Sequence, residues 1–145
     1  MSFTEDDDVR EDNLERKRMG GRTVAIIFTC LTLIGAGATW FTGGVVGTNE
    51  TFTNDAERLS AVVAILLEAV GGAIVAWRFH IGKGFFGGIL LILLLILEIV
   101  VRLTSGSFSG VIILALLTMF MGKAVRAAWE LRKLANEFDV QDTFA

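Results

Sequence analysis

The sequence contains no proline, only one cysteine and only one histidine among its 145 residues. The single cysteine, Cys30, cannot form a disulfide within the chain, and no CxxC or metal-ligand spacing accompanies it. We therefore interpret Cys30 as a small apolar packing residue. The single histidine, His80, has no second ligand near it in the sequence, which argues against a haem or metal site and against a histidine-based catalytic triad. We predict that the protein binds no cofactor and is not an enzyme.

The overall charge of the chain is slightly negative, at −3. Most of that charge comes from the acidic N-terminal arm, and it gives no reason to expect nucleic acid as a partner. Apolar residues, in contrast, make up 53% of the sequence. The run from Ile89 to Leu97 is apolar on every face, whereas a helix of a soluble domain would carry a polar stripe. A chain of this length has room for one transmembrane bundle and little else.

Four long apolar segments predict four transmembrane helices. They cover residues 23–41, 59–79, 84–103 and about 109–128. Each is close to the roughly 20 residues that a helix needs to cross a hydrocarbon layer about 30 Å thick. We therefore predict an all-α integral membrane protein, with a four-helix bundle in residues 23–128. Residues 1–22 are expected to form a polar, mostly disordered arm, because an isolated helix of that length is only marginally stable.

Most of the 13 lysine and arginine residues flank the predicted spans on one side of the membrane. That side holds Arg10, Arg16, Lys17, Arg18, Arg22, Arg78, Lys83, Lys123, Arg126, Arg132 and Lys133, and the other side holds Arg58 and Arg102. Because basic residues are enriched in cytoplasmic loops, this asymmetry predicts that both termini are cytoplasmic. We expect a multi-pass protein of the cell membrane.

A second helical pattern, in residues 129–145, follows the last predicted span. Its apolar residues recur at helical spacing from the end of that span, while the other faces are polar. These apolar residues are Ala127, Leu131, Leu134 and Phe138. We predict a cytoplasmic amphipathic helix, which could lie on the membrane surface, dock against a partner helix or fold back on its own bundle.

Glu68 is the acidic residue nearest to the centre of the predicted bilayer. At about 1.5 Å of rise per residue it lies about 13 Å from the start of its span, and Thr32 and Thr118 fall at a similar depth. An acidic group at this depth costs about 2.5–3.5 kcal/mol on insertion scales. We therefore expect Glu68 to face protein or water rather than lipid. With no cation at its depth, it should be neutral and donate a hydrogen bond.

Small residues on the same side of the helix as Glu68 predict a close contact with another helix. They are Ala61, Ala64, Gly71 and Gly72. The Thr118 face of the fourth span is similar, with Val111, Ala115 and Gly122. We therefore expect a core in which these two faces meet. Gly84 and Gly88 form a further candidate packing site, because two small residues four positions apart allow helices to approach closely.

Two interpretations of Glu68 remain open. It is either a structural hydrogen-bonding group that fixes helix register or contacts another subunit, or a carboxylate that binds a proton or cation in a transport pathway. Glu98 has a simpler interpretation, since Arg102 follows four residues later in the favourable order for an ion pair. Glu98 lies at a different depth from Glu68, although long side chains on neighbouring helices could still interact.

These patterns favour a small membrane protein that acts through helix–helix contacts, as an accessory or scaffold subunit of a larger assembly or as a homo-oligomer. The expected partners are the lipid bilayer and either other membrane protein subunits or further copies of the chain. The alternative is a small proton- or cation-coupled transporter or channel. In that case Glu68 would be the coupling residue, and Glu98 would line the outer part of the path.

Overall fold

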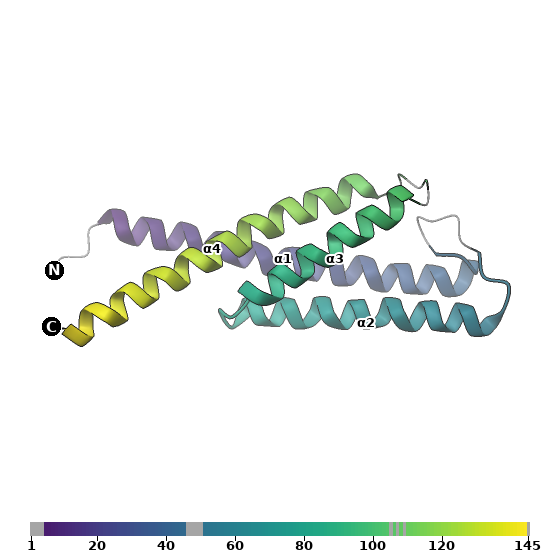
Figure 1. The fold of residues 1–145 in the computed structure, drawn as a ribbon, viewed down its shortest axis with the longest axis horizontal. Coiled ribbons are helices and arrows are strands. Elements are labelled where there is room, and N and C mark those ends of the chain that lie inside the picture. Colours follow the sequence, from purple (N-terminus) through teal and green to yellow (C-terminus); the bar gives the residue numbers. More distant parts are fainter. Residues whose placement is uncertain (1–4, 46–50, 105, 107, 109, 145) are drawn as a thin grey trace.

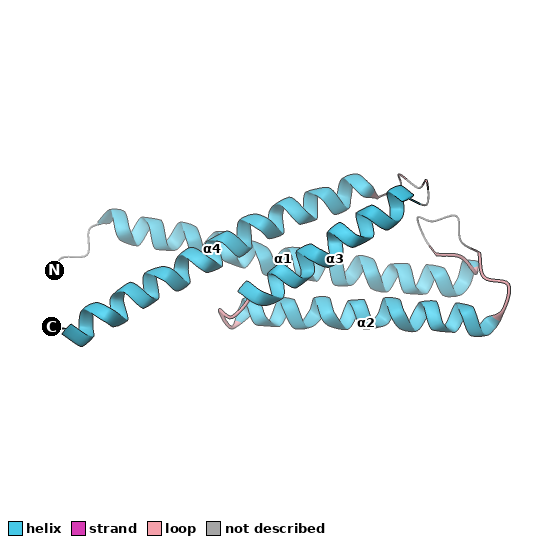
Figure 2. Ribbon diagram, in the orientation of Figure 1, coloured by secondary structure: helices cyan, strands magenta, loops and turns pink. Residues whose placement is uncertain are grey.

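The computed structural model describes residues 5–45, 51–104, 106, 108 and 110–144, with side chains described between residues 9 and 135 of this set. This part of the chain is helical apart from short connections (Figures 1 and 2). The helices are α1 (Glu5–Thr42), α2 (Asp55–His80), α3 (Phe85–Thr104) and α4 (Val111–Phe144). All four are long and apolar enough to span a membrane. The prediction of an all-α chain with four candidate spans is therefore confirmed.

The first helix begins well before the apolar segment that it contains. Residues 5–22, for which the sequence predicts mostly disorder, belong to α1. The apolar part of α1 supplies a helical nucleus, and extending an existing helix is far less costly than starting a new one. Side-chain contacts add to this: Leu14 is only 6% exposed, and Arg18 Nη2 lies 3.3 Å from Glu15 Oε1 one turn earlier.

Capping groups and glycines define the ends of the helices. The Asn54 side chain accepts a hydrogen bond of 2.8 Å from the backbone N–H of Glu57, which satisfies a free donor in the first turn of α2. α1 ends before Gly43, whose positive φ of 71° suits a helix C-terminus. The Gly43 N–H donates to the carbonyl of Thr39 at 3.1 Å. Gly82, with a φ of 77°, reverses the chain between α2 and α3.

The helices pack in a closed order. α1 packs against α2 and α4, α4 packs against α3, and α3 completes the ring with a smaller contact to α2. α2 and α4 are therefore opposite one another. This differs from the expected core, in which the Glu68 face of α2 meets the Thr118 face of α4. The buried residues are Ala69, Gly72, Val75, Ala76 and Phe79 in α2, and Leu114, Leu117, Met121, Ala124, Val125, Ala127 and Ala128 in α4. Of the predicted Glu68 face, Gly72 is buried, but it packs against Thr29 and Phe28 of α1 rather than against α4.

All four helices meet around the ring of Phe79, which is completely buried. A Cβ atom placed on Gly21 of α1 would lie 2.8 Å from this ring, and one placed on Gly84 or Gly88 would lie 2.5 or 2.9 Å from it. Ala124 of α4 lies alongside, because its Cβ would be 2.7 Å from a Cβ on Gly21. Real Cβ atoms do not come this close to other atoms in a well-packed interior. The three glycines, which we call the Phe79 cradle, are therefore required by the size of the ring.

The chain forms two antiparallel hairpins, α1–α2 and α3–α4, which cross one another (Figure 1). The last turns of α1 and α3 and the first turns of α2 and α4 all lie at one end of the molecule (Figure 1). The first turn of α1 and the last turn of α4 both lie at the opposite end, beyond the turn that joins α2 to α3 (Figure 1). The two hairpins are thus joined around Phe79, and they separate toward the end where α2 begins and α3 ends.

α4 is one helix of 34 residues. The predicted fourth span and the predicted C-terminal extension are therefore continuous, and Figure 1 shows no sharp bend between them. Of the predicted apolar stripe, Ala127 is buried, and Leu131 and Leu134 are partly buried. The side chain of Phe138 lies outside the described residues.

Candidate functional site

Glu68 and Thr32 lie at about the same height on neighbouring helices. The register of α1 against α2 is defined at Gly72, where a Cβ atom would lie 2.5 Å from Thr29 Oγ1. Because the two helices are antiparallel, one turn from this contact toward the α1–α2 connection leads to Thr32 on α1 and to Glu68 on α2. The two polar side chains are therefore at one level of the bundle.

Glu68 also faces α3. The register of α2 against α3 is defined where Val75 meets Gly87, with 3.4 Å between Val75 Cγ2 and a Cβ atom placed on Gly87. Glu68 is about two turns from Val75, and Glu98 is about three turns from Gly87, each on the same side of its helix as the contact residue. Both carboxyl groups therefore face the region between α2 and α3.

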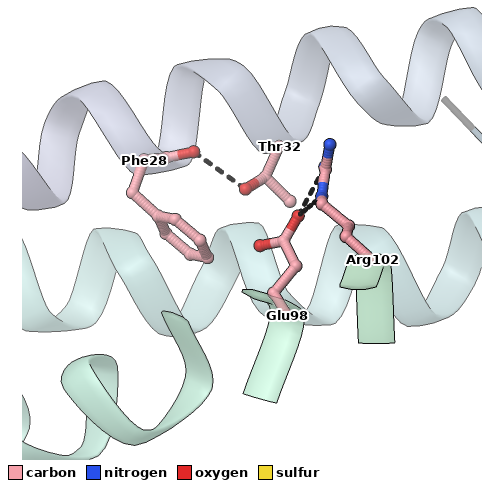
Figure 3. Close-up of polar contacts among 4 residues, drawn as sticks. All are labelled: Phe28, Thr32, Glu98 and Arg102. Atoms are coloured by element: carbon pink, nitrogen blue, oxygen red, sulfur yellow. Dashed lines mark hydrogen bonds and ion pairs between the residues drawn. The ribbon is translucent and has the colours of Figure 1, made fainter. Parts of the chain in front are cut away.

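Glu98 is held by Arg102, one turn later on α3, and the predicted ion pair is present. Arg102 donates two hydrogen bonds to Glu98 Oε1, from Nη2 at 2.7 Å and from Nε at 3.2 Å. The Glu98 and Arg102 side chains are only 32% and 18% exposed, so solvent ions screen the pair weakly. Figure 3 shows the pair pointing from α3 toward Thr32 on α1. Glu68, Glu98, Arg102 and Thr32 form what we call the polar cluster.

Two hydroxyl groups of α1, in and next to the polar cluster, donate hydrogen bonds to carbonyl groups of their own helix. Thr32 Oγ1 donates to the Phe28 carbonyl at 2.8 Å (Figure 3). Thr29 Oγ1, which the sequence pattern does not single out, donates to the Ala25 carbonyl at 2.8 Å. A hydroxyl oxygen that has donated its proton still has lone pairs with which to accept. Both hydroxyls can therefore accept a hydrogen bond from a neutral carboxyl or from another donor.

Three of the predicted site residues lie outside these contacts. Thr118 donates to the Leu114 carbonyl at 2.8 Å on its own helix, and α4 lies opposite α2 in the packing order. A Cβ atom placed on Gly71 or Gly122 would meet open space. Within this chain, therefore, close packing does not require a glycine at either position.

The other predicted packing glycines lie at close approaches. Gly72 faces Thr29 of α1, while Gly84 faces the Phe79 ring. A Cβ atom on Gly88 would collide with Val125 Cγ2 of α4 as well as with Phe79. Gly21, the remaining member of the Phe79 cradle, was missed because it belongs to the predicted polar arm. The signal that could have indicated it is Ala25, a second small residue four positions later.

Glu68 differs from Glu98 in having no partner among the described residues. Its side chain is exposed, and neither a hydrogen bond nor an ion pair joins it to any residue in that part of the chain. The shape of the bundle accounts for this exposure, because α2 and α3 touch at Val75 and Gly87 and the hairpins separate beyond that contact (Figure 1). The hydrogen bond expected from Glu68 is therefore not made within the described structure.

No three histidine, cysteine, aspartate or glutamate side chains among the described residues gather closely enough to hold a metal ion. Comparison of the chain with protein-family models, curated proteins and solved structures gives no match. Fold and site together define a class: an all-helical protein with four helices able to span a membrane and a polar cluster between three of them.

Proposed function

We propose that the protein acts through helix–helix association in the cell membrane, as a subunit of a larger assembly or as a homo-oligomer. The observation that supports this most strongly is the exposed carboxyl of Glu68, without a partner among the described residues, in the middle of α2. Facing lipid at this depth costs a carboxyl about 2.5–3.5 kcal/mol. A helix of a neighbouring subunit that covers the carboxyl and offers a hydrogen-bonding group removes this cost.

The surroundings of Glu68 suit such a contact. Ala64 is exposed one turn before it, and Gly71 has open space beside it on the following turn. Small side chains on both sides of a polar group allow another helix to approach closely. The region where the hairpins separate lies on the same side, so a helix placed there would also come close to Glu98 and Arg102.

The same proposal includes orientation: the four helices cross the cell membrane with both termini in the cytoplasm. It is supported by the concentration of basic residues at the end of the bundle where α1 begins and α4 ends.

Orientation can be measured by labelling single cysteines in a Cys30→Ser background. Thr53 and Ala135 are both exposed. Thr53 lies just before α2 and Ala135 in the C-terminal part of α4, and the start of α2 and the end of α4 lie at opposite ends of the bundle (Figure 1). In intact cells, a membrane-impermeant maleimide should label Thr53→Cys and should label Ala135→Cys only after permeabilisation. The opposite pattern would show that the termini are extracytoplasmic.

Association can be measured with a photoreactive phenylalanine derivative incorporated at Ala64 in native membranes. Illumination should give adducts at twice the mass of the chain if copies associate, or at another fixed mass if the partner is a different subunit. The matched control is Leu93, which is 59% exposed on α3 and points away from α2. It should give less than about one tenth of the adduct. Adding Glu68→Leu should reduce the Ala64 adduct several-fold, because the partner loses its hydrogen-bonding group.

Equal adduct formation at Ala64 and Leu93, together with a monomeric purified protein, would overturn the association. Transport activity would also overturn it. The transport alternative is favoured because Glu68 and Glu98 face a common region. Transport predicts a proton- or cation-dependent flux in proteoliposomes, which Glu68→Gln abolishes while the protein stays folded.

A further inference from the structure

Positive charge gathers in a cleft at the end of the bundle that carries the first turn of α1 and the last turn of α4. The cleft has a volume of about 470 Å³ and is lined by residues of all four helices and of the α2–α3 turn. Its basic lining residues are Arg18, Arg78, Lys83 and Arg132, and the remaining lining residues are apolar or glycine. We call this feature the basic cleft.

The basic side chains are positioned by backbone and aromatic groups. Arg18 lies against the α2–α3 turn, with its Nη1 atom 3.4 Å from a Cβ atom placed on Gly82. In the same turn, Arg78 Nε donates to the Lys83 carbonyl at 3.4 Å. On the opposite wall, the Arg132 guanidinium carbon lies 6.0 Å from the centroid of the Phe86 ring, within the range of a cation–π contact. Arg18, Arg78 and Arg132 are thus held around one opening, which Lys83 also lines.

The positive charge in the basic cleft is poorly compensated. Arg18 Nη2 is paired with Glu15 at 3.3 Å, but Arg18 Nε is buried and has no hydrogen-bond partner among the described residues. Arg78, Lys83 and Arg132 form no ion pair with any other described residue. Like charges held close together repel one another, and a bound anion offsets that repulsion because it attracts each of them. The basic cleft therefore favours an anionic ligand.

Apolar side chains beside the basic cleft, which we call the apolar wall, indicate which kind of anion it binds. Phe86 is 66% exposed in the first turn of α3, and the exposed side chains of Ile89, Leu90 and Leu93 continue from it along the candidate span. A soluble anion gains nothing from such a wall. In a phospholipid, by contrast, the phosphate is covalently joined to acyl chains, which pack favourably on apolar side chains.

We propose that the basic cleft binds the phosphate of an anionic phospholipid, with the acyl chains lying along Phe86 and the first turns of α3. Basic pockets between transmembrane helices bind anionic lipid headgroups in this way. The position of the basic cleft, where the apolar part of α3 begins, places the phosphate at the edge of the hydrocarbon layer. This site is distinct from the polar cluster, which lies further along α3.

The proposal is tested by titrating the full-length protein in detergent micelles with phosphatidylglycerol and with phosphatidylcholine. We expect at least a tenfold preference for phosphatidylglycerol. Lys83→Gln/Arg132→Gln should weaken phosphatidylglycerol binding about 25-fold, because each basic residue near an anionic lipid contributes about fivefold. The matched control is Lys17→Gln/Arg126→Gln, which removes the same charge from exposed positions outside the basic cleft. It should weaken binding less than threefold.

A third variant separates lipid from free phosphate. Leu90→Gln keeps every cation and the Phe86 ring that positions Arg132, and it interrupts the apolar wall at a side chain that is 58% exposed. It should therefore weaken phosphatidylglycerol binding several-fold and leave the binding of inorganic phosphate unchanged. Displacement of phosphatidylglycerol by millimolar inorganic phosphate, with Leu90→Gln behaving as wild type, would show a phosphate site and overturn the lipid proposal. Equal losses in the two double variants, or equal affinity for the two lipids, would also overturn it. Circular dichroism of each variant verifies that the helices are intact.

Discussion

Replacing Phe79 with alanine should lower the free energy of unfolding by about 2–3 kcal/mol. In water-soluble proteins such a change costs about 3–5 kcal/mol, which includes the transfer of the ring from solvent. In a membrane the ring has lipid as its alternative environment, so most of the transfer contribution is lost. The cavity contribution remains: removing roughly 100 Å³ at about 24 cal/mol per Å³ gives the expected value. The glycines of the Phe79 cradle have no side chains that could move into the cavity.

The measurement is reversible unfolding in mixed micelles with increasing dodecyl sulfate, followed by tryptophan fluorescence. Phe120→Ala is the matched control, because Phe120 is 53% exposed on α4 and should change the unfolding free energy by less than about 0.5 kcal/mol. Similar losses for the two variants would show that Phe79 is not the centre of the bundle.

Replacing Gly88 with alanine should lower the unfolding free energy by about 1–3 kcal/mol, the usual cost of overpacking a well-filled interior. The new methyl group would collide with Val125 Cγ2 and with the Phe79 ring. Helix propensity acts in the opposite direction and favours alanine by up to about 1 kcal/mol. At Gly122, where a Cβ atom meets open space, only the propensity remains, so Gly122→Ala should be neutral or stabilising.

A second-site variant tests the cause of the Gly88 effect. Val125→Ala removes the colliding methyl groups, so Gly88→Ala should cost less in that background than in the wild type, and the difference is a coupling energy. The same dodecyl sulfate titration, applied to the four proteins of the cycle, measures it. Additive losses would mean that Gly88 and Val125 do not touch.

The number of helices could be predicted from the sequence because the bilayer imposes it. A chain that crosses lipid must satisfy its backbone hydrogen bonds within each segment, so length and apolarity alone define the candidates. The helical state of residues 5–22 could not be predicted in this way. It depends on attachment to the apolar part of α1 and on the burial of Leu14, and neither follows from the local composition.

The polar residues show the same division between local and distant contacts. The pair formed by Glu98 and Arg102 could be predicted, since both residues lie on one helix four positions apart. The neighbours of Glu68 depend on which helices are adjacent, and the small-residue faces of α2 and α4 indicated the wrong pair. The basic cleft depends on contacts between distant parts of the chain, because Arg18 and Arg132 belong to its first and last helices.

The lengths of the two outer helices have a practical consequence. α1 has 38 residues and α4 has 34, which correspond to about 57 Å and about 51 Å at about 1.5 Å per residue. A hydrocarbon layer about 30 Å thick accommodates little more than half of either length. If the four helices cross the membrane as proposed, about 27 Å of α1 and about 21 Å of α4 extend beyond the hydrocarbon layer as rigid spacers. A fluorophore or a fused domain attached to either end would stand clear of the lipid, at a separation determined by the helix rather than by a flexible linker.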